Sequence, residues 1–255
     1  MITPSQLAAD FESLGIKAGM TILLHSSLKS VGEVCGGPVA VILALEEILT
    51  TEGTLVIPTF NTNLTDPSRW RFPPVHSEQI PSILAEMPAF DANLTPTRQM
   101  GCVSETFRKQ EGVVRSSHPH LSFAAWGKNA EYLCSEHPFR FGLGPESPLG
   151  RIYNLGGHVL LLGVTHDRNT SIHLAEYSSR VSKNIVVEKA PVISEGARRW
   201  VEFEELEFDD SDFLEIGKNF EKESDNFWTR KVGEADAKLM SQTHLVDFAR
   251  RYMSQ

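Results

Sequence analysis

The chain has 255 residues, a formal net charge of −9 at pH 7 and 41% hydrophobic residues. That apolar content is enough for a full core, which excludes a disordered tail protein, and the acidic balance argues against general nucleic-acid binding. The sequence has no apolar run of the ~18 residues that a membrane helix needs, and no signal-peptide pattern at its start. We therefore expect a cytoplasmic protein, monomer or homodimer, with neither nucleic acid nor membrane as a partner.

The cysteines are widely spaced and odd in number, at Cys35, Cys102 and Cys134. Because no Cys-x-x-Cys pair occurs, we expect neither a disulfide framework nor a cysteine zinc site. The sequence predicts reduced thiols that behave as small buried apolar residues.

The first part of the chain predicts a β-loop-α-β unit. A short helix over 5–14 is followed by a buried strand over 21–25 and by a loop rich in serine and glycine. A helix is predicted over 38–49, where Pro38 suits a first helical position, and a second buried strand over 54–58. Such a unit is most easily built as a right-handed parallel crossover.

The remainder of the chain alternates short elements with loops. Residues 61–80 are irregular, and a loop of this length is typical of a functional segment. The hydrophobic pattern predicts helices near 79–87, 103–109, 128–135, 147–154, 170–181, 212–222 and 243–253. It predicts strands over 122–126, 158–164, 185–191 and 199–208.

These elements predict a fold of the α/β class for residues 1–255. We expect a single layered αβα domain whose mixed sheet starts with parallel strands. Antiparallel strands are expected in the C-terminal third, because their polar alternation is typical of a solvent-facing side.

A His–Glu pair is the sharpest local feature. His173 and Glu176 are three residues apart in the predicted helix, so both side chains can lie on one face. Such a pair can form a general base with its orienting carboxylate. From spacing alone, a surface ion pair of Glu176 with Arg180, beside a passive histidine, stays open.

Two polar loops are further candidates. The segment His25–Gly32 follows a buried strand, where ligands bind in α/β sheets, and its small residues let backbone N–H groups approach a phosphate or an oxyanion. It matches no nucleotide motif, so an ordinary connecting loop stays open. The segment Arg115–Ser122 offers donors for a phosphate or carboxylate, although a plain polar turn stays open.

Acidic residues cluster at 204–212. Such a run is commonly a solvated face, but beside a cleft it would attract a polycation.

Taken in order, the segments resemble one family. The chain is similar to the aminoglycoside 3-N-acetyltransferase family, which includes antibiotic-resistance enzymes. The resemblance covers most of residues 5–180, and more loosely Asp209–Asp212 and the C-terminal helix. Its matching segments are 25–32, Gly36-Gly37, 53–60, Phe107-Arg108, 115–119, 122–125, 147–149, 160–164 and 170–176.

The resemblance implies an acetyl-CoA-dependent N-acetyltransferase whose fold differs from the histone-acetyltransferase-like fold. It implies that His173 is the general base and Glu176 its orienting partner, and that the substrate amine attacks the thioester directly. Backbone N–H groups near Ser26–Leu28 become candidates for the oxyanion hole. The implied acceptor is the 3-amino group of a 2-deoxystreptamine aminoglycoside, a cationic small molecule that fits the net charge of −9.

The resemblance also implies two sets of binding residues and no metal. The coenzyme candidates are His25, Ser26, Ser27, Leu28, Lys29, Ser30, Val31, Gly32, Arg115, Ser116, Ser117, His118 and Ser122. The acceptor candidates are Thr59, Phe60, Asp66, Trp70, Glu105, Asp209 and Asp210. The role of His25 within its set is left undecided.

Three alternatives stay open at this point. One is a family member that acetylates a different small amine. Another is a metal-dependent hydrolase that uses His118, His120, His166 and Asp167. The third is a binding protein that has kept the fold without catalysis.

Overall fold

The computed structural model describes residues 1–178 and 183–254, and its centre is one seven-stranded sheet. Along the sheet, the strands are β3 (Val114–Arg115), β4 (Phe123–Gly127), β2 (Thr54–Pro58), β1 (Thr21–Ser26), β5 (His158–Leu162), β9 (Ala235–Ser241) and β8 (Phe227–Val232). Strands β2 and β5 flank β1 and run parallel to it, whereas the outer strands pair antiparallel. The mixed sheet with a parallel start is therefore confirmed.

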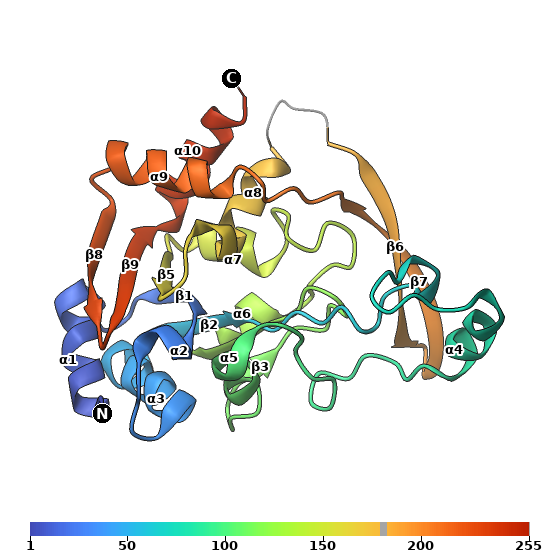
Figure 1. The fold of residues 1–255 in the computed structure, drawn as a ribbon, viewed down its shortest axis with the longest axis horizontal. Coiled ribbons are helices and arrows are strands. Elements are labelled where there is room, and N and C mark those ends of the chain that lie inside the picture. Colours follow the sequence, from blue (N-terminus) through green and yellow to red (C-terminus); the bar gives the residue numbers. More distant parts are fainter. Residues whose placement is uncertain (179–182, 255) are drawn as a thin grey trace.

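Helices cover both faces of this sheet (Figure 1). Because side chains of a strand alternate between faces, Leu160 and Leu162 enter one core while Val159 and Leu161 enter the other. The first core takes α1 (Pro4–Leu14), α3 (Gly37–Leu49) and α5 (Gly101–Phe107). The second takes α6 (Ala130–Cys134), α7 (Pro148–Asn154), α8 (His173–Glu176), α9 (Phe213–Glu223) and α10 (Gln242–Tyr252).

The ends of the first helix show why the sequence forms it. The side chain of Thr3 accepts a hydrogen bond from the Gln6 amide, and Pro4 occupies the first helical position. The helix ends at Gly15, whose φ of 108° lies in the left-handed region that glycine enters freely. No helix in the described part of the chain is long and apolar enough to cross a membrane.

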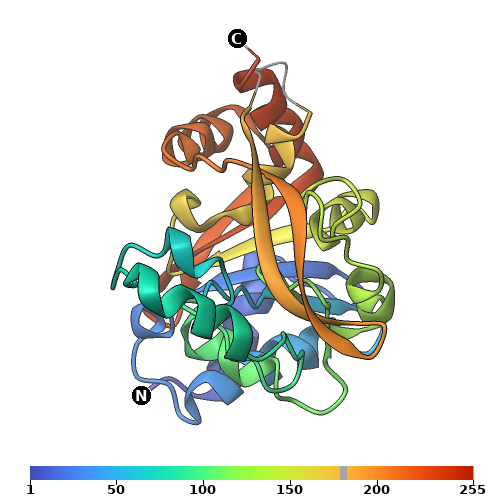
Figure 2. The ribbon, with the colours of Figure 1, turned by 90° about the vertical axis from the view of Figure 1, so that its right-hand side faces the viewer.

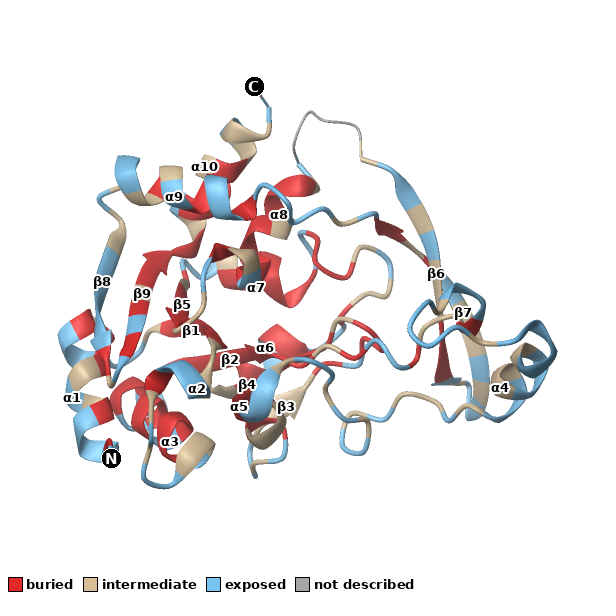
Figure 3. Ribbon diagram, in the orientation of Figure 1, coloured by how far each residue is buried: buried red, intermediate tan, exposed pale blue. Residues whose placement is uncertain are grey.

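A two-stranded hairpin stands apart from the sheet (Figures 1 and 2). Its strands β6 (Ile185–Ser194) and β7 (Ala197–Leu206) pair antiparallel, which confirms that prediction. The hairpin is tied to α4 (Ile80–Glu86), because Trp200 Nε1 and Arg198 donate to the Leu84 carbonyl at 2.8 and 3.1 Å. Figure 3 shows that buried residues concentrate in the sheet, whereas α4 has no buried residue and the hairpin mixes buried, intermediate and exposed ones.

Some predictions about the elements were wrong. No strands were predicted at β8 and β9, which supply the antiparallel C-terminal strands of the main sheet. The helix predicted over 170–181 is α-helical only over His173–Glu176, preceded by a 3₁₀ turn at Thr170–Ile172. Its predicted residues Arg180 and Val181 lie outside the described part of the chain.

The cysteine prediction was correct for one residue. Cys134 is buried, but Cys35 and Cys102 are exposed, so the expectation of buried thiols was wrong for these two. All three thiols are free.

Candidate active site

A cleft opens where the parallel strands end, which is the edge at which α/β sheets bind ligands. Strands β2 and β5 lie on opposite sides of β1, so chain segments diverge from the end of β1 and leave a hollow of about 810 Å³. We call it the strand-end cleft. Its lining residues include His25–Lys29, Ile57, Pro58, Phe60, Gln99–Val103, Val164, Asp167–Thr170, His173, Asp210 and Phe213.

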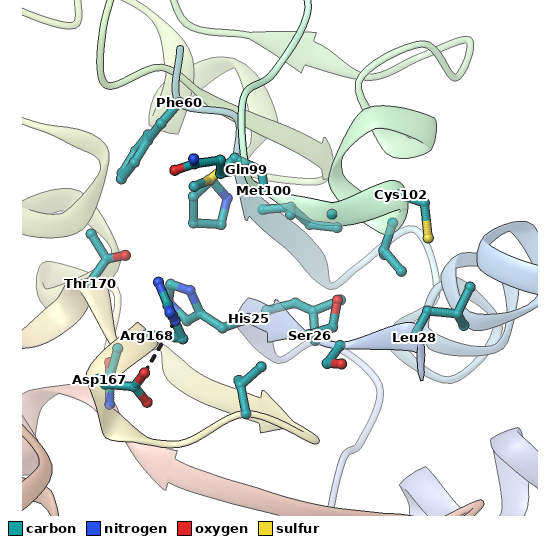
Figure 4. Close-up of a pocket in the computed structure, with 18 of the residues that line it drawn as sticks. His25, Ser26, Leu28, Phe60, Gln99, Met100, Cys102, Asp167, Arg168 and Thr170 are labelled. Atoms are coloured by element: carbon teal, nitrogen blue, oxygen red, sulfur yellow. Dashed lines mark ion pairs between the residues drawn. The ribbon is translucent and has the colours of Figure 1, made fainter. Parts of the chain in front are cut away.

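The side chains of the cleft come from four segments, of which the one after β2 supplies Phe60 (Figure 4). His25 and Ser26 end β1 and Leu28 follows it, while Gln99 and Met100 precede α5 and Cys102 lies in its first turn. Asp167, Arg168 and Thr170 come from the loop after β5, and Arg168 forms an ion pair with Asp167 at 3.2 Å.

The segment after β1 provides free backbone donors. The Ser27 amide donates to the Leu162 carbonyl at 2.9 Å, so this N–H belongs to the sheet and is unavailable as an oxyanion donor. The next two amides, Leu28 and Lys29, start the short helix α2 (Leu28–Val31) and make no hydrogen bond within residues 1–178 and 183–254.

His25 forms part of the cleft floor as a neutral imidazole. The side chain is only 8% exposed, and burial lowers the pKa of His25 to about 3. Its Nε2 has no hydrogen-bond partner among the described residues. His25 is therefore suited to contact a ligand as an uncharged group and unsuited to act as a base.

His173 and Glu176 meet as their spacing predicted. His173 Nδ1 lies 2.5 Å from Glu176 Oε2, and the Glu176 side chain has no exposed surface. The other carboxylate oxygen, Oε1, lies 2.9 Å from Lys183 Nζ. Rings of Phe208 and Phe213 contact the imidazole, each with centroids 4.6 Å from it. Glu176 and these rings fix the imidazole, so its Nε2 is left for a substrate.

Buried contacts of the preceding loop position this pair. His166 is 1% exposed and its Nε2 lies 2.8 Å from Glu221 Oε1 on α9. Asn169 Nδ2 lies 3.2 Å from His166 Nδ1, and Asn169 Oδ1 accepts from the Ser171 amide at 3.3 Å. Helix α9 approaches closely through Gly217, because a Cβ there would lie 2.0 Å from the His166 ring. These hydrogen bonds and the close packing against α9 hold the loop that leads into His173 in one position.

A second, smaller hollow lies under the hairpin. It measures about 290 Å³ and is lined by Phe60, Thr62, Thr65, Arg69, His120, Leu121, Val186, Glu188, Phe203 and Glu205–Phe208. We call it the hairpin pocket. Phe60 lines both hollows, and Phe208 reaches from this pocket to the ring of His173. The base candidate therefore lines the cleft and contacts one aromatic side chain of the hairpin pocket.

The structure does not bring all coenzyme candidates to the cleft. His25–Lys29 line it, whereas Ser30, Val31 and Gly32 are not among its lining residues. Arg115 and Ser122 bond to Thr59, Ser116 bonds to His137, and His118 is fully buried. These four residues support the interior, and Ser117 faces solvent.

The acceptor candidates are also divided. Phe60 and Asp210 line the cleft, whereas Thr59 is buried in the bonds just described. Asp66 pairs with Lys189 at 2.9 Å, and Trp70 Nε1 donates to Thr65 at 2.9 Å. The Arg108 guanidinium holds the pKa of Glu105 well below its usual range, and Asp209 is exposed and accepts from the Ser211 amide.

Several lining residues escaped the sequence analysis. Gln99, Met100 and Gly101 carry no charge and match no motif, so only the glycine hinted at a turn. Gln99 has a φ of 59° and Gly101 one of 81°, which folds this segment over the cleft. Glu188 was missed because it lies inside a strand that was predicted only for its alternation, whereas Glu205 and Glu207 belong to the acidic run that the sequence had singled out.

The residues of the metal alternative do not converge. His118 and His120 contact Phe203 of the hairpin, whereas His166 contacts α9. Among the described residues, no group of three or more His, Cys, Asp or Glu side chains is arranged to hold a metal ion.

Fold and site together define an α/β protein with a ligand cleft at its strand ends and a buried His–Glu pair. The family model for aminoglycoside 3-N-acetyltransferase matches residues 23–254. The SPbeta prophage-derived aminoglycoside N(3')-acetyltransferase-like protein YokD of Bacillus subtilis is 47% identical, over 98% of this chain and 92% of YokD. Aminoglycoside N(3)-acetyltransferase III of Pseudomonas aeruginosa is 34% identical, over 98% and 93%. The chain belongs to the aminoglycoside 3-N-acetyltransferase family, whose named members are acyltransferases.

Solved structures agree with this assignment. The crystal structure of YokD from Bacillus subtilis matches with a TM-score of 0.97 at 46% identity, over 99% of this chain and 93% of YokD. A binary complex of AAC-IIIb with CoASH matches with a TM-score of 0.88 at 26% identity, over 98% and 95%. AAC-VIa bound to sisomicin matches with a TM-score of 0.86 at 26% identity, over 98% and 96%.

Proposed function

We propose that the protein transfers an acetyl group from acetyl-CoA to the 3-amino group of a 2-deoxystreptamine aminoglycoside, in the cytoplasm. The observation that carries the proposal is the position of the His173–Glu176 pair, whose imidazole lines the cleft and contacts Phe208 of the hairpin pocket. A transferase for two substrates needs a base where both meet. The family membership and the CoASH- and sisomicin-bound relatives support the choice of substrates.

The strand-end cleft suits the coenzyme. Its volume of about 810 Å³ lies near the upper end of small-molecule sites. The free amides of Leu28 and Lys29 and the Lys29 ammonium would face the pyrophosphate or the thioester oxygen. Bound there, acetyl-CoA would supply a thioester whose carbonyl carbon accepts a nucleophile. Arg115, Ser116, Ser117, His118 and Ser122 are left out of the proposed site, because none of them lines the cleft.

His173 would act as the base. Its Nε2 accepts a proton from the acceptor nitrogen as that nitrogen bonds to the carbonyl carbon. Glu176 stabilises the imidazolium that forms, since its carboxylate already holds Nδ1 at 2.5 Å. The imidazolium then returns the proton to the departing thiolate. No covalent enzyme intermediate is needed, because the bound amine is the nucleophile.

The hairpin pocket suits the acceptor. It shares Phe60 with the cleft and carries the carboxylates of Glu188, Glu205 and Glu207. Asp210 adds a carboxylate in the cleft itself. Carboxylates beside the base would orient the ammonium groups of a cationic substrate.

The decisive test is thiol release from acetyl-CoA with a panel of 2-deoxystreptamine antibiotics. We expect turnover by the wild type and a fall of roughly 10²–10⁴-fold in kcat for His173→Ala, the range typical of a lost general base. His244→Ala, an exposed histidine on α10, serves as the matched control and should keep wild-type turnover. Near-full activity of His173→Ala at neutral pH would refute the assignment, and no release with any antibiotic would refute the acceptor class.

A further inference from the structure

The hairpin pocket differs from a simple acidic site because it contains its own cation. Apolar side chains form most of its wall, from Phe60, Leu121, Val186, Phe203, Leu206 and Phe208. Its volume of about 290 Å³ is small for a ligand site. The hairpin pocket can therefore hold one ring of a multi-ring antibiotic rather than the whole molecule. The charged groups on its wall are the Arg69 guanidinium and the carboxylates of Glu188, Glu205 and Glu207.

The guanidinium is committed to one of these carboxylates. Arg69 Nη1 lies 2.6 Å from Glu188 Oε1 and 3.3 Å from the Val187 carbonyl oxygen. The Glu188 side chain is 20% exposed and that of Arg69 is 49% exposed. The positive charge therefore sits at the pocket mouth, in the place where an ammonium group of a ligand would pair with Glu188.

The other two carboxylates have neutral partners. Glu205 accepts from the Tyr177 hydroxyl at 2.5 Å and from the Gly142 amide at 2.7 Å. Glu207 Oε2 accepts from Asn184 Nδ2 at 3.0 Å. These partners carry no positive charge, and burial raises the pKa of Glu205. Glu188 is therefore the carboxylate on this wall that an arginine neutralises.

We propose that Arg69 is a specificity-determining residue that competes with the ammonium groups of the acceptor for Glu188. Its fixed charge repels additional positive charge, so the pocket discriminates against the more highly charged aminoglycosides. The inference rests on the proposed function, since it concerns which acceptors that reaction takes. Arg69 does not contact the reacting atoms, and it therefore acts on KM rather than on kcat.

The test compares acceptors and variants in pairs. Sisomicin carries amino groups on several rings, whereas 2-deoxystreptamine alone carries fewer. For Arg69→Gln, we expect the KM for sisomicin to fall about three- to tenfold at low salt, with kcat and the KM for 2-deoxystreptamine within about twofold. The gain should shrink at high salt, because screening weakens exposed charges. A merely structural role of Arg69 would produce no such split.

Three further variants separate charge from structure. Arg69→Lys keeps the charge and should retain the wild-type KM. Arg199→Gln removes an equal charge from the turn end of the same hairpin, where Arg199 pairs with Glu195, and should also retain it. Glu188→Gln leaves the guanidinium unpaired and should raise the KM for sisomicin, so the proposal has an opposite-sign test if Arg69→Gln fails to fold.

Calorimetric titration with sisomicin keeps this test distinct from the proposed function. If no variant releases thiol but sisomicin binds Arg69→Gln three- to tenfold more tightly than the wild type, the proposed reaction is wrong and the role of Arg69 stands. If the wild type turns over and Arg69→Gln has an unchanged or higher KM for sisomicin, the inference is wrong. Absence of sisomicin binding to both proteins also overturns it.

Discussion

The strand-end cleft and the hairpin pocket are built on different physical grounds, although they share Phe60, and Phe208 of the pocket contacts His173 of the cleft. The cleft follows from sheet topology, because β1, β2 and β5 are parallel neighbours whose ends converge at one edge. The pocket follows from pairings between remote segments, such as Arg69 with Glu188, which are 119 positions apart. The strand-end cleft is therefore formed by the backbone topology of the sheet, whereas the hairpin pocket depends on side-chain contacts between remote segments.

This difference implies a division of labour. Under the proposed function, changes at the His173–Glu176 pair would alter the chemical step, whereas changes in the hairpin pocket would alter which acceptor binds. The contrast makes kcat the readout for the first region and KM the readout for the second.

The largest expected effect belongs to Glu176. Replacing it by glutamine, Glu176→Gln, removes the negative charge that holds His173 Nδ1 and stabilises the imidazolium. We expect kcat to fall about 10²–10⁴-fold at neutral pH, while the KM for the acceptor changes little. Steady-state thiol release at saturating acetyl-CoA measures both parameters.

Glu215→Gln is the matched control for that variant. Glu215 lies on α9 and accepts from the Tyr252 hydroxyl at 2.7 Å at the surface. It should leave kcat unchanged within about twofold. A Glu176→Gln enzyme with kcat within threefold of the wild type would show that the carboxylate only supports the fold. It would contradict the proposal that this site controls kcat while the hairpin pocket controls KM.

The same contrast explains what the sequence could predict. Apolar runs and a proline at a helix start located β1, α3 and β2, and the spacing of His173 and Glu176 put both side chains on one face. Such signals are local, so they survive without knowledge of the tertiary fold. They also placed His25–Lys29 at the strand ends, where the structure has them.

The predictions that were missed or incomplete concern long-range contacts. Arg115 has the donors that an anion site needs, but its guanidinium donates hydrogen bonds to the carbonyls of Ala92, Thr95 and Thr59. No local pattern distinguishes an arginine that braces loops from one that binds a phosphate. Strand β9 did carry a local signal, because Ala235, Ala237 and Leu239 alternate with polar residues, and this alternation was overlooked.

A smaller effect concerns three buried histidines beside the hairpin. The ring of His118 packs against those of His137 and Phe203 at 4.8 and 5.5 Å, and His120 also contacts Phe203. Burial lowers the pKa of His120 and of His137 to about 4 each, and lowers that of His118 as well. These neutral rings connect the hairpin to the sheet.

Their depressed pKa sets the pH dependence of stability. Below the ordinary pKa of 6.5 the unfolded chain binds protons that the folded rings refuse, so stability falls as pH drops from 6.5 toward 4. We expect the free energy of unfolding to fall by about 1–2 kcal/mol per histidine between pH 7 and pH 5, measured by urea titration. His120→Gln, which keeps a donor toward the Leu64 carbonyl, should reduce that loss by one histidine's share. An equal loss in variant and wild type would contradict this.

The smallest expected effect tests which face of the hairpin matters. Glu188 points into the pocket, whereas the neighbouring Val187 side chain is 59% exposed on the opposite face. Only the backbone carbonyl of Val187 contacts Arg69, so Val187→Thr keeps both that bond and the β-branched shape of the side chain. The free energy of unfolding should change by less than about 0.5 kcal/mol, and the KM for sisomicin by less than twofold. A loss above about 1 kcal/mol would mean that the outer face is covered in solution, because an exposed methyl-to-hydroxyl change has no other way to cost so much.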